Sequence, residues 1–386
     1  MITSIILSTC LGSAHISLTD LVKVIQDGTG NVTTPESRIF WYARLPRTAA
    51  CVLAGAALAV SGVVIQKVLT NQLASPGIIG VNAGAGLAVT LCCAFGAFSG
   101  WIIAGAAFGG AIAAVLLVAL TAQKIGASRT TVILGGVAVN SCLNAASEAI
   151  SILVPDAGMQ AADFRVGGFS NVTYVRLLPA GILILLGLIC LFTLTNELDV
   201  ISLGEDTAQG LGMPVKRVRT VFLGLSALLA GAAVSFAGLL GFVGLIVPHV
   251  GRKLVWEESG KLIPFCALIG AGFVTFCDLF ARTLFSPYEI PVGIFMSFIG
   301  GPFFLFLLIN RKGGHSLAIG FCTLSQSFVV GEFFVGIQNN SVYSLASKFQ
   351  VHISVIITFG GCGELAQDIF EHLFFQILVS DIRFDN

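Results

Sequence analysis

Residues 68–123 read VLTNQLASPGIIGVNAGAGLAVTLCCAFGAFSGWIIAGAAFGGAIAAVLLVALTAQ and contain no charged side chain. The bilayer core requires such runs, because an Asp, Lys or Arg at the centre of a spanning helix costs roughly 2.5–3.5 kcal/mol even on a lenient insertion scale. A hydrocarbon core about 30 Å thick needs about 20 mostly apolar residues per helix. The stretch therefore predicts membrane-spanning helices.

The composition of the whole chain extends this prediction. Charged residues make up 10% of the 386 residues, and the mean hydropathy is +0.95. An apolar alternation with period two, as in an outer-membrane barrel, is nowhere sustained. We therefore predict an all-α integral membrane protein, a polytopic bundle of about ten transmembrane helices.

The individual spans can be located from the apolar runs. Residues 1–11 are apolar but too short to span alone, so nine or ten helices are expected in all. Small residues four apart, as in Gly55/Ala59, Gly80/Gly84 and Gly105/Gly109, predict close helix crossings, since helices in lipid associate largely through such packing. The remaining spans are predicted at about 48–68, 79–97, 101–123, 131–153, 175–196, 218–238, 241–251, 262–281 and 291–310.

The charges predict two regions and an orientation. Residues 1–313 carry 18 Lys+Arg and 14 Asp+Glu, whereas residues 314–386 carry 2 and 6 and are richer in Ser, Gln and Asn. We predict a membrane domain over 1–313 and an unassigned tail over 314–386. By the positive-inside rule, the more basic set of loops is placed in the cytoplasm. That set holds Lys124, Arg129, Lys216, Arg217, Arg219, Arg252, Lys253, Lys261, Arg311 and Lys312, and the outer set lies within 20–47, 155–176 and 282–291.

The most unusual polar insert, residues 197–219, reads ELDVISLGEDTAQGLGMPVKRVR. Ser202 and Glu205 have the Ser-x-x-Glu spacing of a capping box, which predicts a short helix that Gly210 or Gly212 can end. The insert lies among the cytoplasmic loops. It is interpreted either as a docking surface for a soluble partner or as an ordered loop.

Few side chains within the predicted spans suggest a metal site or another functional role. His249 has no second His, Cys or carboxylate at metal-ligand spacing beside it, and the ten cysteines mostly lie inside apolar spans. No metal site is therefore predicted. The acids Glu148 and Asp278 are functional candidates because intramembrane carboxylates are costly. The favoured interpretation of Glu148 is a neutral, hydrogen-bonded acid.

Seven segments in order resemble the FecCD family, the iron-siderophore and vitamin B12 importer permeases of the ABC superfamily. The resemblance spans about residues 11–313, and the joint order and spacing of its segments make it specific. The segments are RLPR (44–47), AGAALAVSG (54–62), NQLASPGIIGV (71–81), SLGEDTA (202–208), GFVGLIVPH (241–249), DLFAR (278–282) and EIPVG (289–293).

The resemblance implies a permease of the bacterial cytoplasmic membrane that pairs with a second copy or a close paralogue. Two cytoplasmic ATP-binding subunits would power alternating access, and an extracytoplasmic protein would deliver an iron(III)-siderophore, haem or cobalamin. The chain itself would need no cofactor, because Mg-ATP is bound by the partner ATPase. Lipid is the only other partner implied, and nucleic acid is not among them.

The resemblance also assigns roles to residues. Arg44, Arg47 and Arg282 match the outer-face positions that bind acidic residues of the binding protein. The cytoplasmic gate is matched by Asn71, Leu73, Ala127 and Ser128, although the family usually has Pro where this chain has Gln72. The segment that couples to the ATPase is matched by Ser202, Gly204, Glu205, Asp206, Ala208, Leu211 and Gly212. Asp278 matches a recurring family position near a helix end, where hydrogen bonds to its neighbours suffice, so the favoured interpretation of this acid is structural.

Two other classes of protein were weighed against this one. The chain lacks the G-x-x-x-x-G-K-[ST] loop that cradles nucleotide phosphates, so the ATPase must be a separate subunit. A secondary transporter driven by protons through Glu148 or Asp278 is the main alternative, although no clear repeat relates the two halves. An intramembrane enzyme would need convergent catalytic groups within the spans, and none is evident in the sequence.

Overall fold

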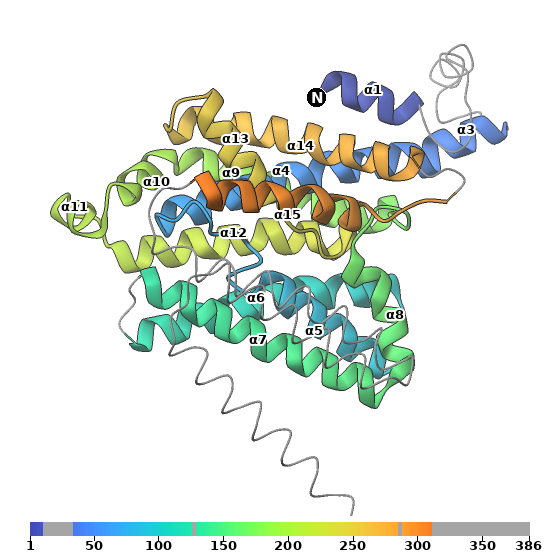
Figure 1. Ribbon diagram of the computed structural model, residues 1–386, viewed down its shortest axis with the longest axis horizontal. Coiled ribbons are helices and arrows are strands. Elements are labelled where there is room, and N and C mark those ends of the chain that lie inside the picture. Colours follow the sequence, from blue (N-terminus) through green and yellow to red (C-terminus); the bar gives the residue numbers. More distant parts are fainter. Residues whose placement is uncertain (11–33, 126–128, 285–287, 311–386) are drawn as a thin grey trace, which may run out of the picture. The chain divides into compact units, whose positions relative to one another are not determined.

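The computed structural model describes residues 1–10, 34–125, 129–284 and 288–310. The described residues form helices and no strand, as predicted, and Met1–Phe306 forms a compact unit of its own (Figure 1). The tail 314–386 and the gate residues Ala127 and Ser128 lie outside the described residues. The domain boundary at 313 stays a prediction.

Every predicted span coincides with a helix. Six helices among the described residues are long and apolar enough to cross a membrane, and α1, α5, α13 and α15 are shorter or only partly described apolar helices, which agrees with about ten in all. The helices are α1 (Ile2–Cys10), α3 (Pro35–Ile39), the π-helix η2 (Phe40–Arg44), α4 (Leu45–Val68), α5 (Val81–Ala94), α6 (Gly100–Ile125), α7 (Arg129–Leu153), α8 (Pro155–Val166), α9 (Tyr174–Thr193), α10 (Thr195–Ser202), α11 (Glu205–Gly210), α12 (Val215–Ala237), α13 (Val243–Leu254), α14 (Ser259–Thr283) and α15 (Val292–Asn310).

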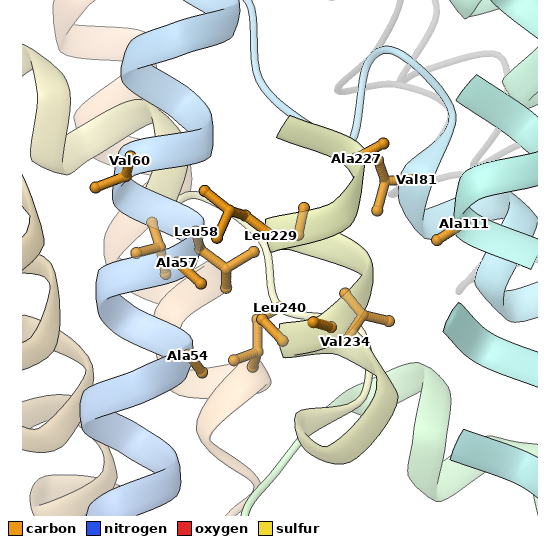
Figure 2. Packing of buried hydrophobic residues seen from close by; sticks show 14 of the residues in the cluster. Ala54, Ala57, Leu58, Val60, Val81, Ala111, Ala227, Leu229, Val234 and Leu240 are labelled. Carbon is orange, nitrogen blue, oxygen red and sulfur yellow. The ribbon is translucent and has the colours of Figure 1, made fainter. Parts of the chain in front are cut away.

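Helix α4 lies at the centre of the unit. Its continuous helical stretch is 83% buried over the most apolar window, more than any other candidate span among the described residues. It packs against α12, α13 and α14, and Figure 2 shows Ala54, Ala57 and Leu58 facing Leu229 of α12 and the Leu240 segment. A spanning helix buried this fully contacts protein rather than lipid on most of its surface.

Glycines set the distance between α4 and its neighbours. A Cβ atom added at Gly55 would lie 2.3 Å from the carbonyl oxygen of Gly270 in α14. One added at Gly62 would lie 2.1 Å from the carbonyl oxygen of Gly244 in α13. Real Cβ atoms do not approach oxygen this closely, so both crossings require glycine.

The small-residue prediction is confirmed at two sites and wrong at the third. Gly84 packs against Gly110 and the side chain of Ala114, which joins α5 to α6. Gly105 and Gly109 instead lie on the exposed face of α6, where an added Cβ would meet nothing within 4 Å. Helical spacing alone does not say which face of a helix meets a neighbour.

The glycine-rich segment after α12 breaks the helix. Gly238 has φ +70°, a backbone conformation that favours glycine, and α13 begins only at Val243. The break is held by backbone hydrogen bonds: the Leu239 N–H donates to Phe164 O at 2.9 Å, and the Gly168 N–H donates to Ala237 O at 2.8 Å. The end of α8 thereby becomes fixed to the gap between α12 and α13.

Charged residues attach both ends of α4 to α14. Arg47, in its first turn, contacts Asp278 near the end of α14, and Lys67, in its last turn, contacts the residues that begin α14. The 24 residues of α4 separate these ends by roughly 36 Å at 1.5 Å per residue. This antiparallel pairing is the frame on which both candidate sites are built.

We predict that Gly62→Ala destabilises the protein, because the new Cβ atom forces α4 and α13 apart. The expected loss is about 1–3 kcal/mol of unfolding free energy, the usual cost of overpacking. The matched control is Gly109→Ala, which adds the same atom to open space and replaces a poor helix former. Thermal unfolding of the detergent-solubilised variants measures the difference, and equal stabilities would contradict the crossing.

Candidate functional site

A network of polar groups joins three helices at the cytoplasmic end of α4. The Lys67 ammonium group donates to Asp199 Oδ1 of α10 at 2.5 Å, to Glu257 O at 2.6 Å and to Ser259 Oγ at 2.7 Å. Asp199 in turn accepts from the Ser259 N–H, at 3.1 Å to each carboxylate oxygen. Ser259 is the first residue of α14, so the carboxylate also lies at the positive end of that helix.

The charge on Asp199 is favoured by these contacts. Burial opposes ionisation and raises its pKa, but the hydrogen bonds from Lys67 and Ser259 outweigh burial, so the net pKa of Asp199 is lowered from its usual value. A lowered carboxyl pKa means that the stabilisation is present above the ordinary Asp range and is lost as pH falls through the folded-state value. The network is therefore intact at neutral pH.

The insert that follows contains two short helices. The predicted short helix is present as α11 and ends at Gly210, but Ser202 does not cap it, so the capping box is the part of the prediction that is wrong. Ser202 ends α10, and its hydroxyl donates back to Asp199 O at 2.7 Å instead of capping the next helix. Gly204, at φ +126°, makes the turn, and α11 begins at Glu205. The Ser-x-x-Glu spacing predicted the wrong cap because the Glu205 carboxylate pairs outside its own helix, with Arg219 at 2.9 Å.

The α10–α11 segment exposes two leucines to its surroundings. Ala208 is fully buried and the Glu205–Arg219 pair fastens α11 to α12, whereas Leu203 and Leu211 are each 66% exposed. Asp206 and Gly212 are exposed beside them. Figure 1 shows α11 at the edge of the unit, beyond α10, where a large partner can reach it.

Two of the predicted gate residues lie in the loop after α4. The Asn71 side-chain oxygen accepts a hydrogen bond from the Leu73 N–H at 3.0 Å, which closes a tight turn. Both side chains are half-buried, and Gln72 between them is exposed. The loop leaves the helix that carries Lys67, so the gate residues follow directly on the Lys67–Asp199–Ser259 network.

The arginine residues at the outer end of α4 are bonded within the chain. Asp278 is fully buried, and Arg47 donates to its two oxygens through Nε at 3.2 and 3.1 Å and through Nη2 at 2.9 Å. Arg47 also pairs with Glu289 at 2.8 Å, and Arg282 Nε lies 3.6 Å from Asp278 Oδ2. The structural interpretation of Asp278 thus agrees with the contacts it makes.

Arg44 and Arg282 bind the last turn of α1. Arg44 Nη1 donates to Thr9 O at 2.8 Å, and Arg282 Nη2 donates to Ser8 O at 2.6 Å and to Ser8 Oγ at 2.7 Å. Arg44 is 4% exposed and Arg282 is 3% exposed. The three predicted docking residues are therefore brought together, and each is engaged by groups of the chain itself.

Glu148 and His249 belong to neither site. Glu148 is half-buried on α7, and its charge acts on Arg165 of α8, whose pKa is lowered by burial against that attraction. Arg165 Nη2 also donates to Ser147 Oγ at 2.6 Å and Ser151 Oγ at 2.9 Å. The ring of His249 packs edge-on against Phe303, 5.9 Å between centroids. The part of the chain that the structure describes contains no group of three or more potential metal ligands.

Comparison with known proteins settles the class. The model of the FecCD transport family matches residues 1–310. The chain belongs to the FecCD transport family. It is 36% identical over 307 residues to the Fe(3+)-citrate import system permease protein YfmD of Bacillus subtilis, covering 80% of this chain and 90% of that protein.

Other relatives extend the comparison. The probable siderophore transport system permease protein YfhA of Bacillus subtilis is 39% identical, covering 80% and 91% of the two chains. The vitamin B12 import system permease protein BtuC of Shigella boydii is 33% identical, covering 81% and 93%. A solved structure described as an inward-facing metal-chelate type ABC transporter has a TM-score of 0.71 at 28% identity and covers 80% of this chain and 96% of that one.

The family membership confirms the predicted class. The chain is a permease subunit of an ABC importer, a multi-pass protein of the bacterial cytoplasmic membrane rather than an enzyme. ATPase and substrate-binding proteins are the partners of such a permease. The proton-driven alternative through Glu148 or Asp278 is not favoured.

Sequence reasoning missed the residues that join the insert to the membrane helices. Asp199 and Lys67 are far apart in the sequence, and neither has a motif around it. The available signal was weak: Lys67 ends a long charge-free helix, and Ser259 stands where a helix N-terminus is expected. A contact between segments 132 positions apart could only be seen in the fold.

We predict that Asp278→Asn destabilises the protein by about 3–5 kcal/mol, because removing one partner leaves buried guanidinium groups without their counter-charge. The control is Asp156→Asn on the exposed face of α8, expected within about 0.5 kcal/mol of the parent. Thermal unfolding in detergent gives the comparison. Wild-type stability of Asp278→Asn would show that the carboxyl group is not an ion-pair anchor.

Proposed function

We propose that the chain is the membrane subunit of an importer that carries an iron(III) chelate of the citrate or siderophore type. Several relatives are iron-import permeases by name, among them the Fe(3+)-citrate permease YfmD and the iron-uptake system permease protein FeuB of Bacillus subtilis. In this proposal the chain pairs with a second permease copy or paralogue and binds two ATPase subunits.

The observation that carries the mechanism is the bonding of α10 to both α4 and α14 through Asp199. The α10–α11 segment, with exposed Leu203 and Leu211, would receive the ATPase. Movement of the ATPase subunits would then be transmitted to α4 and α14 through Lys67 and Ser259, and the neighbouring Asn71–Leu73 turn would open or close the cytoplasmic gate.

The outer end of the same helix pair would receive the binding protein. Arg47 and Arg282 lie on α4 and α14, and their planar guanidinium groups suit two-point recognition of carboxylates. A binding protein that contacts these residues would act on the helices that the ATPase moves from the other end. Arg44, in η2, would complete the acidic-residue pocket.

Transport by the reconstituted complex tests the proposal. Proteoliposomes containing the permease, its ATPase and its binding protein should take up radioactive iron(III) citrate or an iron(III)-siderophore in an ATP-dependent manner, and cobalamin should be a poor cargo. Uptake that survives without the ATPase but collapses with a proton uncoupler would instead favour a proton-driven carrier. Preferred uptake of cobalamin would contradict the proposed cargo.

The same assay measures coupling through Asp199. Asp199→Asn keeps the size of the side chain but removes its charge, so the ATPase should still co-purify while uptake falls by about tenfold, the effect of losing one charge-assisted contact. The matched control is Asp156→Asn, an exposed acid on α8 outside both candidate sites. Normal uptake by Asp199→Asn would contradict the transmission route.

We predict that Leu211→Asp weakens binding of the ATPase, because it replaces one of the two exposed leucines of the α10–α11 segment, Leu203 and Leu211, with a charge. Co-purification from detergent should fall by at least about tenfold, as for loss of an interface hot spot. Leu153→Asp, an equally drastic change at an exposed leucine ending α7, should leave capture unchanged. Glu205 is a poorer probe, since replacing it disturbs the pair with Arg219.

A further inference from the structure

The last turn of α1 occupies the guanidinium groups of two of the three arginines at the outer site. Thr9 O accepts from Arg44 at 2.8 Å, and Ser8 O and Ser8 Oγ accept from Arg282 at 2.6 and 2.7 Å. The Ser8 hydroxyl also lies 3.0 Å from the Thr48 hydroxyl of α4. Four elements, α1, η2, α4 and α14, thus meet at this turn.

The chemistry of the contact is that of a helix C-terminus capped by cations. The last four carbonyl groups of a helix have no hydrogen-bond donor inside it, and together they carry roughly half a negative elementary charge. Helix α1 has no basic residue in its own last turn. Arg44 and Arg282 supply the missing donors from other elements.

The Thr9 and Ser8 carbonyl groups occupy hydrogen-bond donors of Arg44 and Arg282 that a carboxylate of the binding protein would need. Arg44 and Arg282 are 4% and 3% exposed, and the last turn of α1 is part of what covers them, since it bonds to both guanidinium groups. We propose that the last turn of α1 is an internal competitor for the binding protein, displaced from Arg44 and Arg282 when the binding protein docks. This inference rests on the proposed docking role of the arginines.

The charges indicate that the competitor can be displaced. A carboxylate brings a full negative charge and two acceptor oxygens to a guanidinium group, whereas the helix end offers about half a charge. Arg47 differs, since it bonds to the carboxylates of Asp278 and Glu289 at 2.9 and 2.8 Å, whereas Arg282 lies 3.6 Å from Asp278 and makes its shorter contacts to Ser8. The competition is therefore confined to the two arginines that face α1, and Arg47 stays anchored to α14.

A reversible lock tests the competition. The hydroxyl groups of Ser8 and Thr48 are 3.0 Å apart, so cysteines at both positions place their sulfur atoms within bonding reach. In the purified full-length permease, Ser8→Cys with Thr48→Cys should lower the affinity for the binding protein at least about tenfold when oxidised, and reductant should restore it. The single-cysteine variants are the controls, and mass spectrometry of the bridged peptide verifies the bond.

A second variant moves the affinity in the opposite direction. Ser8→Ala removes one acceptor from Arg282, so binding should tighten by about twofold to tenfold. Ser4→Ala is the matched control on the same helix, because the Ser4 hydroxyl bonds only to Met1 O among the contacts of the described residues.

The outcomes separate the two proposals. If the lock and Ser8→Ala leave the affinity unchanged while Arg282→Gln lowers it, the arginines dock the binding protein but α1 does not compete. If Arg282→Gln, shown to be folded by gel filtration, also leaves the affinity unchanged, the docking role has failed and the competition fails with it.

Discussion

Backbone contact between α4 and α14 is the constraint on which the described structure depends. Helices in lipid gain no hydrophobic free energy by meeting one another, so they must gain it from close packing and polar contacts. Gly55 and Gly270 supply the packing at the middle of this pair. Asp278 on Arg47, and Ser259 on Lys67, supply the polar contacts at its two ends. Three attachments along about 30 Å, from Arg47 to Lys67, make one stiff unit of two helices.

In the proposed mechanism, the stiffness of the α4–α14 pair lets it transmit movement of the ATPase during transport. Buried charges are costly without their partners, so neither end of the pair can separate without a large loss of stability. A displacement applied to α10 through Asp199 must therefore move α4 and α14 together rather than bend or part them. The glycines at the middle of the α4–α14 pair allow the two helices to approach closely. The charged contacts at the two ends of the pair fix how the helices align along their axes.

Composition was sufficient to predict the class of fold, and motif spacing was sufficient to predict the family. The positions of the spans followed from charge-free runs, because the cost of an intramembrane charge is large and local. Finer features depend on contacts between distant segments and could not be predicted in this way. Ser202 has the spacing of a cap but bonds to Asp199, and Gly105 has the spacing of a crossing but lies on an exposed face. The arginines at the outer site and Asp278 were located by motif, whereas the partners Ser8 and Thr9 on α1 were not.

The stiff pair also fixes a thermodynamic relation between its two ends. If docking at the outer arginines changes the affinity of the α10–α11 segment for the ATPase, the ATPase must change the affinity for the binding protein by the same factor. In the proposed competition, the contact of α1 with Arg44 and Arg282 also enters this relation, because docking would break it and motion of α4 and α14 would loosen it. The contact would lower the apparent affinity for the binding protein by the fraction of molecules in which the arginines are released. Any motion of α4 and α14 that loosens α1 would therefore raise that affinity, and the ATPase would regulate docking without contacting the outer face.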